Sequence, residues 1–170
     1  AQDNISKSVF KIMKNNFIIF THCHSTNVVN SLIYSKKKGK NFEVYNTETR
    51  PLYQGRKTAK ELAQNEINVT MFIESALDEV FTGKQGAKKP NAVFIGADAL
   101  IKNGVINKIG SELISKIAFK SGVPVYVIAD SWKFTKNKIP LEKRKINEIW
   151  DKAPKNVKII NPSFEFVDKK

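Results

Sequence analysis

The sequence predicts an α/β fold, a Rossmann-like doubly wound parallel sheet in a single domain. Short apolar runs recur about every 25 to 30 residues, with amphipathic helical patterns between them. Several runs are apolar throughout rather than alternating, which is typical of strands covered on both faces. Repeated strand–helix–strand order indicates right-handed βαβ units, and these build a parallel sheet. The expected strands are residues 17–20, 42–45, 67–73, 92–95, 124–128 and 157–160.

An amphipathic helix precedes the first strand, because Ile5, Val9 and Ile12 recur at helical spacing. We therefore expect residues 1–16 to form a connecting helix and residues 17–170 to form the Rossmann-like domain. No internal repeat or low-complexity linker divides the chain.

Three further helices are expected between the strands. Residues 28–33 and 113–118 each place apolar side chains on one face of a helix. The second of these helices begins near Ser111, and Gly122 and Pro124 mark its end. Ser75 and Asp78 have the spacing of a capping box, which predicts a helix that starts there.

The composition is that of a soluble globular domain, with 41% hydrophobic and 26% charged residues. A single cysteine excludes a disulfide within the chain and fits a reducing compartment. No apolar run approaches the length of a membrane span, and the first residues lack the order of a signal peptide. We expect a cytoplasmic protein with no membrane partner.

The chain has a formal net charge of +13, from 29 basic residues of which only three are Arg. Sequence-reading nucleic-acid proteins favour Arg for its bidentate contacts with bases and phosphates. The scattered Lys residues are more typical of a solvated basic surface, and nucleic-acid binding is a minor alternative. A third use is to attract a doubly phosphorylated small molecule.

Polar motifs follow the expected strands, and parallel strands end at one edge of their sheet. Ligands of such sheets bind at this edge, near the point where strand order reverses. The sequence therefore predicts one site built from all of these motifs. They are THCHS (21–25), TETRPLYQ (47–54), GAD (96–98), DSWKF (130–134) and Asn161-Pro162.

His22, Cys23 and His24 are the only residues of their types in the chain. Three consecutive ligands cannot easily wrap one tetrahedral ion, so a metal site is disfavoured. If a helix starts at Ser25 or Thr26, its amides should favour the Cys23 thiolate and lower the thiol pKa. The alternative is a small buried cysteine that fills space. Serine-hydrolase, dinucleotide and P-loop motifs are absent from the sequence.

Asp98 ends a strand that is otherwise apolar, where a buried acid would cost free energy unless it had a purpose. The alternative interpretation is that Asp98 caps a following helix. An acid and a thiol that face one pocket could act as a proton-transfer pair.

The ordered motifs THCHS, TETRPLYQG with KTAKEL, IGADALIKNGVINKIG and SWKF resemble one family. It contains ribose-1,5-bisphosphate isomerase, methylthioribose-1-phosphate isomerase, and the alpha, beta and delta regulatory subunits of translation initiation factor 2B. The resemblance covers roughly residues 17–164 and implies that Cys23 accepts a proton and Asp98 donates one. The implied substrate-binding residues are Ser25, Thr26 and Asn27 (a phosphate-contacting turn), Gln54, Asn107, Lys108 and Lys133. Arg50 is either a pocket charge or part of a tight turn before Pro51.

Within the family, the chain resembles the archaeal ribose-1,5-bisphosphate isomerase of AMP metabolism. Cys23 and Asp98 are both present, whereas the regulatory subunits tend to lack them, and the stretch from Cys23 to Glu48 is short. The implied reaction is an aldose–ketose isomerisation that yields ribulose-1,5-bisphosphate. Asp98 would protonate the ring oxygen, and the Cys23 thiolate would carry the C2 proton to C1 through an enol. No metal or nucleotide cofactor is implied.

The family's amino-terminal helical domain, with its phosphate-binding Arg-Gly-Ala segment, has no counterpart in this sequence. We expect the carboxyl-terminal domain of a longer protein, inactive or nearly so alone, and a homodimer or larger assembly such as a hexamer. The main rival is a non-catalytic regulatory domain, similar to those of initiation factor 2B, that binds a protein or nucleotide.

Overall fold

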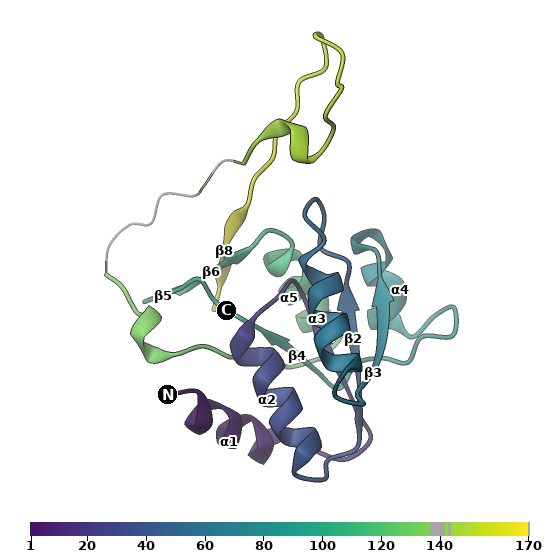
Figure 1. Ribbon diagram of the computed structural model, residues 1–170, viewed down its shortest axis with the longest axis vertical. Helices are drawn as coiled ribbons and strands as arrows, with labels where there is room; N and C mark the ends of the chain where they lie inside the picture. The colour runs from purple at the N-terminus through teal and green to yellow at the C-terminus, as the bar shows by residue number, and fades with distance from the viewer. Residues whose placement is uncertain (137–141, 143, 170) are drawn as a thin grey trace.

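A five-stranded parallel sheet forms the centre of the computed structural model, which describes residues 1–136, 142 and 144–169 (Figure 1). The predicted domain end, Lys170, lies outside the described residues. The strand order is β3-β2-β1-β4-β7, and every neighbouring pair is parallel. The α/β prediction is therefore confirmed. The strands are β1 (Phe17–Thr21), β2 (Phe42–Thr47), β3 (Asn68–Phe72), β4 (Ala92–Ile95) and β7 (Val125–Val127).

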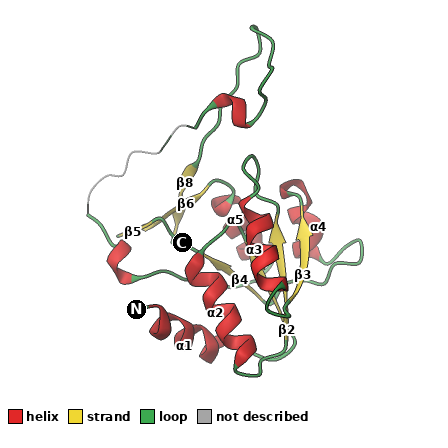
Figure 2. Cartoon of the chain, viewed as in Figure 1, coloured by secondary structure: helices red, strands yellow, loops and turns green. Residues whose placement is uncertain are grey.

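Helices cover both faces of this sheet (Figure 2). Neighbouring residues of β1 point to opposite faces: Ile19 packs with the first helix group and Phe20 with the second. This two-sided burial explains why the strand is apolar throughout, and a side chain such as Phe20 contributes about 1.5–3 kcal/mol by leaving water. The first group is α1 (Gln2–Ile12), α2 (Thr26–Lys37) and α3 (Gln54–Ala63), and the second is α4 (Leu77–Thr82) and α5 (Ser111–Lys120).

Strand order reverses between β1 and β4, which lie side by side in the centre of the sheet. From β1 the chain moves outward to β2 and β3, then crosses back to β4 on the other side of β1. The segments that follow β1 and β4 leave the sheet in divergent directions, and a crevice opens between them. Cys23 follows β1 and Asp98 follows β4, so the reversal point brings both residues to one place.

A second, three-stranded antiparallel sheet was not predicted. It contains β5 (Ala99–Ile101), β6 (Gly104–Lys108) and β8 (Phe164–Asp168), in the order β5-β6-β8. The predicted strand at 157–160 is wrong, because these residues form an irregular segment in which Ile160 is 74% exposed. Asn161 therefore precedes the last strand instead of following one.

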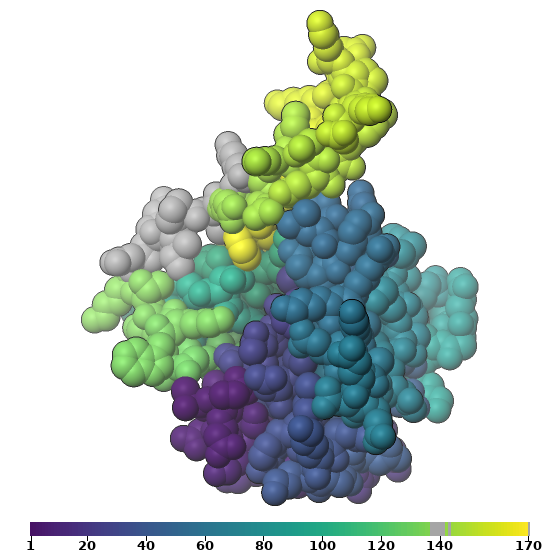
Figure 3. Space-filling view, viewed as in Figure 1, coloured from purple at the N-terminus to yellow at the C-terminus, as the bar shows by residue number. Residues whose placement is uncertain are grey.

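Residues 144–163 project from the body as an arm and return to it at β8 (Figure 3). The arm carries a short 3-10 helix, η3 (Ile146–Glu148). Arg144 donates its backbone N–H to the carbonyl oxygen of Asn161 at 3.2 Å, which joins the two ends of the arm. The base of the arm therefore stays close to the end of β6.

The predicted capping box at Ser75 is also wrong. A short 3-10 helix, η1 (Glu74–Ala76), occupies this position, and α4 begins at Leu77 without a side-chain cap. The Glu74 carboxylate instead accepts the backbone N–H of Thr49 at 2.5 Å. The acid in this segment thus supports the loop after β2.

Candidate functional site

Two adjoining cavities lie at the carboxyl ends of β1 and β4, with volumes of about 310 and 290 Å3. They share five lining residues, among them Ser25, Asp98 and Asn107. The structure brings together all nine site residues predicted from the sequence. Cys23, Gln54 and Lys108 line the first cavity alone, Thr26, Asn27 and Lys133 the second alone, and Ser25, Asp98 and Asn107 line both.

Cys23 has a left-handed backbone with φ of 65°, which turns the chain out of β1 and toward α2. Threonine hydroxyls hold this turn on both sides. The Cys23 N–H donates to Oγ1 of Thr49 at 3.0 Å, and the Thr58 hydroxyl donates to the Cys23 carbonyl at 2.8 Å. Cys23 is half-buried and lines the first cavity, so it is not sealed in the core.

The predicted lowering of the Cys23 pKa is wrong. Burial raises the pKa of the Cys23 thiol, and the Asp98 carboxylate raises it further. A backbone hydrogen bond from His24 and the charge of Lys108 act in the opposite direction, but burial is the largest effect. At the start of α2, Ser25 is the N-cap, and its hydroxyl accepts the Val28 N–H at 3.5 Å.

Asp98 faces the same cavities from the other side of the reversal point. Its backbone N–H donates to the Ile106 carbonyl at 2.8 Å, which ties it to β6, and β5 follows directly. The interpretation of Asp98 as a helix cap is therefore wrong. Asp98 is an exposed residue at the cavity rim, but desolvation still raises the pKa of its carboxyl above the usual value, while Lys133 and Lys108 lower it.

Asn107 and Lys108 are the last two residues of β6, and both are buried. The Asn107 amide donates to the Ser111 hydroxyl at 2.9 Å, which donates to the Lys108 carbonyl at 2.6 Å. The Lys108 ammonium lies 5.9 Å from the centre of the Phe164 ring and is only 4% exposed as a residue. The hairpin of β5 and β6 thus carries an acid, an amide and a cation to one wall.

The other predicted binding residues come from three different segments. Gln54 begins α3, and its buried Oε1 has no hydrogen-bond partner within the described residues. Lys133 belongs to the 3-10 helix η2 (Ser131–Lys133) and donates to the Ala97 carbonyl. Thr26 and Asn27 are the first residues of α2. Arg50 lines neither cavity; it is exposed and lies over the ring of Tyr53.

The two histidines have separate hydrogen-bond partners. His22 is buried, with Nδ1 at 2.5 Å from Oγ1 of Thr47 and Nε2 at 2.8 Å from the Ile109 carbonyl. His24 is half-buried, with Nδ1 at 3.1 Å from Oγ1 of Thr58. No three His, Cys, Asp or Glu side chains gather as a metal site in the part of the chain that the structure describes.

Sequence reasoning missed several cavity residues. Arg144 enters the first cavity from the arm and is paired with Glu148 at 2.8 Å. Its rarity, as one of three Arg residues, was the available signal. Asn161, expected at the rim, instead holds the arm by donating to the Lys145 carbonyl and to Glu148. The other missed lining residues are Lys57, Ser163 and Phe164 in the first cavity. His22, His24 and Gly96 in the first cavity, and Ala97 and Asp130 in the second, belong to the motifs predicted to meet at this edge.

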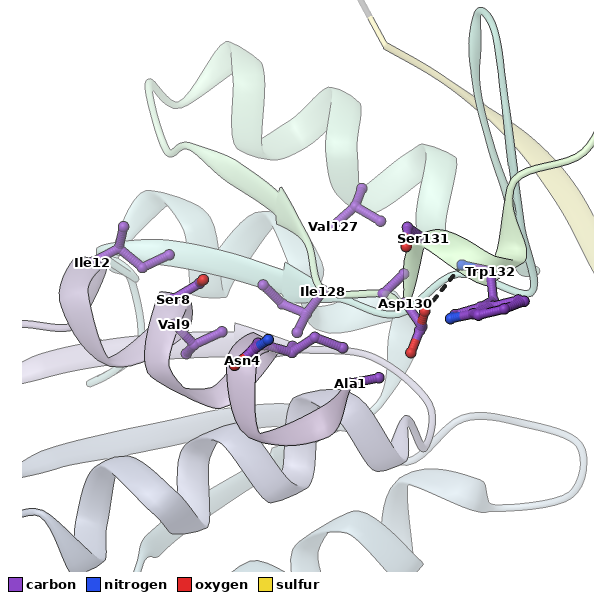
Figure 4. A pocket seen from close by; sticks show the side chains of 12 residues that line it. Ala1, Asn4, Ser8, Val9, Ile12, Val127, Ile128, Asp130, Ser131 and Trp132 are labelled. Carbon is purple, nitrogen blue, oxygen red and sulfur yellow. Dashed lines mark hydrogen bonds between the residues drawn. The ribbon is translucent and has the colours of Figure 1, made fainter.

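A larger cavity of about 670 Å3 lies elsewhere, between α1 and the segment after β7 (Figure 4). Its walls are Val9 and Ile12 of α1 facing Val127 and Ile128, with Trp132 at one end. It contains neither the thiol nor Asp98. Size alone therefore does not identify the reactive site, whereas the chemistry of the lining does.

No helix among the described residues is long and apolar enough to cross a membrane. The predicted cytoplasmic location stays a prediction.

Known proteins match the chain along nearly its whole length. A model of the Initiation factor 2 subunit family matches residues 1–167. The ribose 1,5-bisphosphate isomerase of Methanocaldococcus jannaschii is 35% identical over 97% of this chain and 54% of its own length. The methylthioribose-1-phosphate isomerase of Fervidobacterium nodosum is 34% identical over 96% of this chain and 51% of its own length.

Solved structures agree with this assignment of the fold. The crystal structure of translation initiation factor eIF-2B, subunit delta, from A. fulgidus matches with a TM-score of 0.86 and 27% identity. The match covers 98% of this chain and 53% of that one. The chain therefore spans about half the length of the curated relatives that it matches.

Proposed function

The chain belongs to the Initiation factor 2 subunit family, and from this membership we propose that its site isomerises ribose-1,5-bisphosphate to ribulose-1,5-bisphosphate. The observation that carries the proposal is the convergence of Cys23 and Asp98 on one cavity that also holds Asn107 and Lys108. The similarity to named sugar-phosphate isomerases, at 34–35% identity, supports the same reaction class.

The raised pKa values of the two reactive groups affect the proposed steps in different ways. A raised pKa keeps the Asp98 carboxyl protonated over a wider range of pH, so it can donate a proton to the ring oxygen of the sugar. Once deprotonated, a thiol of raised pKa is a stronger base toward the C2 proton, although less of it is thiolate at neutral pH. The same sulfur returns that proton to C1, and Asp98 recovers its proton from the C2 hydroxyl as the ketone forms.

The charge around the cavities suits a phosphorylated ligand. Lys57, Lys108 and Arg144 line the first cavity, and Lys133 lines the second. The carboxylates that line them are Asp98 and Asp130, so cations are in excess. A volume of about 310 Å3 is at the lower end of ordinary small-molecule sites, which fits a pentose bisphosphate.

Turnover and binding should be measured separately. We expect the protein to convert ribose-1,5-bisphosphate to ribulose-1,5-bisphosphate, and Cys23→Ser to lose turnover while its Kd changes less than about threefold, because a hydroxyl is a much weaker acid than a thiol. Cys23→Ser with full activity would overturn the proposal.

A regulatory role in translation initiation is the second candidate, favoured by the similarity to eIF-2B subunit delta at 27% identity. It predicts a stable complex with the initiation factor's alpha subunit and no sugar-phosphate turnover. Isomerase activity that depends on Cys23 would decide against it.

Self-association into a homodimer or hexamer is also part of the proposal. Large apolar side chains are exposed beside the edge strand β7, with Phe119 79% and Trp132 89% exposed. Light scattering after size-exclusion chromatography would measure the mass. A monomer at micromolar concentration would contradict self-association.

A further inference from the structure

Each of the two histidines beside Cys23 belongs to a hydrogen-bonded chain that ends on the Cys23 backbone. On one side, His22 contacts Thr47, whose hydroxyl lies 3.2 Å from that of Thr49, and Thr49 accepts the Cys23 N–H. On the other side, His24 contacts Thr58, which donates to the Cys23 carbonyl. Both histidines therefore help to hold the turn, but they differ in what their second ring nitrogen does.

The hydrogen bonds assign the tautomer of His24. A carbonyl oxygen can only accept, so the single hydroxyl proton of Thr58 is used on the Cys23 carbonyl. The contact between Thr58 and His24 then requires Nδ1 of His24 to carry the proton and donate. A neutral imidazole has one N–H, so Nε2 of His24 has a free lone pair. No described residue makes a hydrogen bond with Nε2.

His22 has no such free nitrogen. Its Nε2 faces the Ile109 carbonyl and must donate, so its Nδ1 accepts from the Thr47 hydroxyl. The protein uses both nitrogens of His22, which is 2% exposed. The two histidines are thus held in opposite tautomers. Both ring nitrogens of His22 have partners within the protein, whereas Nε2 of His24 has none among the described residues.

The surroundings of His24 keep its ring neutral. Burial lowers its pKa, the charge of Lys57 lowers it further, and Glu61 acts weakly in the opposite direction. His24 also lines both cavities, together with Ser25, Gly96, Asp98 and Asn107. The chain therefore places an uncharged acceptor among the cations of the site.

We propose that His24 is a substrate-binding residue whose Nε2 accepts a hydrogen bond from a hydroxyl of the bound sugar phosphate. The inference rests on the proposed function and adds a residue to its site. Phosphate oxygens cannot donate to Nε2 when they are ionised, so the acceptor selects the sugar and not its phosphates. A cavity lined by lysines alone would lack this selection.

Two substitutions separate binding from support of the turn. In His24→Asn the amide reaches the position of Nδ1 and can still donate to Thr58, but nothing remains at Nε2. In His24→Gln the longer side chain reaches the position of Nε2 and offers an acceptor there, while the bond to Thr58 is lost. The unfolding midpoint of each variant would be measured alongside binding.

We expect His24→Asn to weaken the binding of ribose-1,5-bisphosphate by about fivefold to tenfold, and His24→Gln by less than about threefold. The reverse order would overturn the inference, because it would mean that His24 acts only through Thr58. Inorganic phosphate is the control ligand, since it has no sugar hydroxyl and should bind both variants as it binds the natural chain.

Nitrogen NMR of the imidazoles gives a second readout. In the free protein the proton of His24 should be on Nδ1, and the Nε2 signal should move when ribose-1,5-bisphosphate binds but not when inorganic phosphate binds. A proton on Nε2, or an unmoved signal in the saturated complex, would overturn the inference. Failure of the natural chain to bind the sugar phosphate at all would instead overturn the proposed function and the inference with it.

Discussion

Gly96 and Ser25 approach each other so closely that a β-carbon on Gly96 would lie 2.6 Å from Oγ of Ser25. Gly96 follows β4, and Ser25 is the residue that caps α2. Both residues line both cavities. This contact therefore joins the two segments that diverge at the reversal point and sets the width of the site between them.

Gly96→Ala should destabilise the fold and weaken ligand binding. The added methyl group would push the Ser25 hydroxyl out of its capping position, which we expect to cost about 1–3 kcal/mol in the free energy of unfolding. Urea denaturation of the chain measures it. The matched control is the double variant Gly96→Ala with Ser25→Gly, which removes the clashing side chain while glycine still serves as a cap. Equal destabilisation of the single and double variants would show that the clash is not the cause.

The sequence predicted five strands of the parallel sheet correctly, because a strand such as β1 needs apolar residues on both faces and shows this in its composition. The nine site residues could also be placed at one edge from the sequence. All strands of the parallel sheet run in the same direction, so their carboxyl ends lie at the same edge of the sheet. The rule requires no knowledge of side-chain conformation.

Errors arose where distant segments compete or cooperate. Ile160 lies in an apolar run that resembles a strand, but residues 157–160 join neither sheet. The edge of β6 pairs instead with residues 164–168. The Cys23 pKa depends on burial by segments far along the chain, which outweighs the nearby helix start. Arg144 lines the cavity from the arm, whose two ends are joined by the hydrogen bond between Arg144 and Asn161. No local pattern encodes these three results.

Asp98→Asn should change the shape of the pH–rate profile as well as its height. The active form needs Asp98 protonated and Cys23 as thiolate. Between the two pKa values, the thiolate fraction of Cys23 rises with pH by the same factor by which the protonated fraction of Asp98 falls. The kcat/KM of the natural protein should therefore not change with pH in this range. In Asp98→Asn only the thiol titrates, so the residual rate should rise about tenfold per pH unit toward the raised thiol pKa.

Measurement of kcat/KM between pH 6 and 9 in the active protein tests this reasoning. We expect the rate of Asp98→Asn at neutral pH to be about 100-fold to 10,000-fold below that of the natural protein. A flat profile in the variant would contradict the assignment of Cys23 as the titrating base. Asp130→Asn is the matched control, because Asp130 lines the second cavity and not the one that contains Cys23.

Lys108→Met should lose ligand binding without loss of stability. Lys108 is only 4% exposed, and none of the ion pairs among the described residues includes it. A buried cation without a salt bridge costs free energy that an apolar side chain of similar length does not. We expect the free energy of unfolding to stay equal or rise by about 1–2 kcal/mol, while the Kd for ribose-1,5-bisphosphate rises at least tenfold.

Lys57→Met provides the comparison for this variant. Lys57 lines the same cavity but is exposed, with only a long contact of 3.8 Å to Glu61. Its replacement should leave stability within about 0.5 kcal/mol. If Lys108→Met destabilises the chain by several kcal/mol, the Lys108 side chain is structural and its proposed role in binding loses support.

His22 should make the stability of the chain depend on pH below neutrality. Burial lowers its pKa in the folded state; Lys108 lowers it further, and the Ile109 carbonyl and Glu74 partly oppose this. Above the unfolded value of 6.5, neither state is protonated and stability does not depend on this group. As the pH falls below 6.5, the unfolded chain binds a proton that the folded chain does not. The free energy of unfolding should then fall by up to about 1.4 kcal/mol per pH unit.

His22→Gln removes this titration and should flatten the curve of stability against pH between 6.5 and 5. The variant should also be less stable at pH 7, by about 1–3 kcal/mol, because Thr47 and the Ile109 carbonyl lose their partner. His24 also has a lowered pKa but is half-buried, so it contributes a weaker dependence of the same sign. Urea denaturation at several pH values measures both effects. Parallel curves for the natural chain and His22→Gln over this range would mean that His22 takes up its proton equally in the folded and unfolded states.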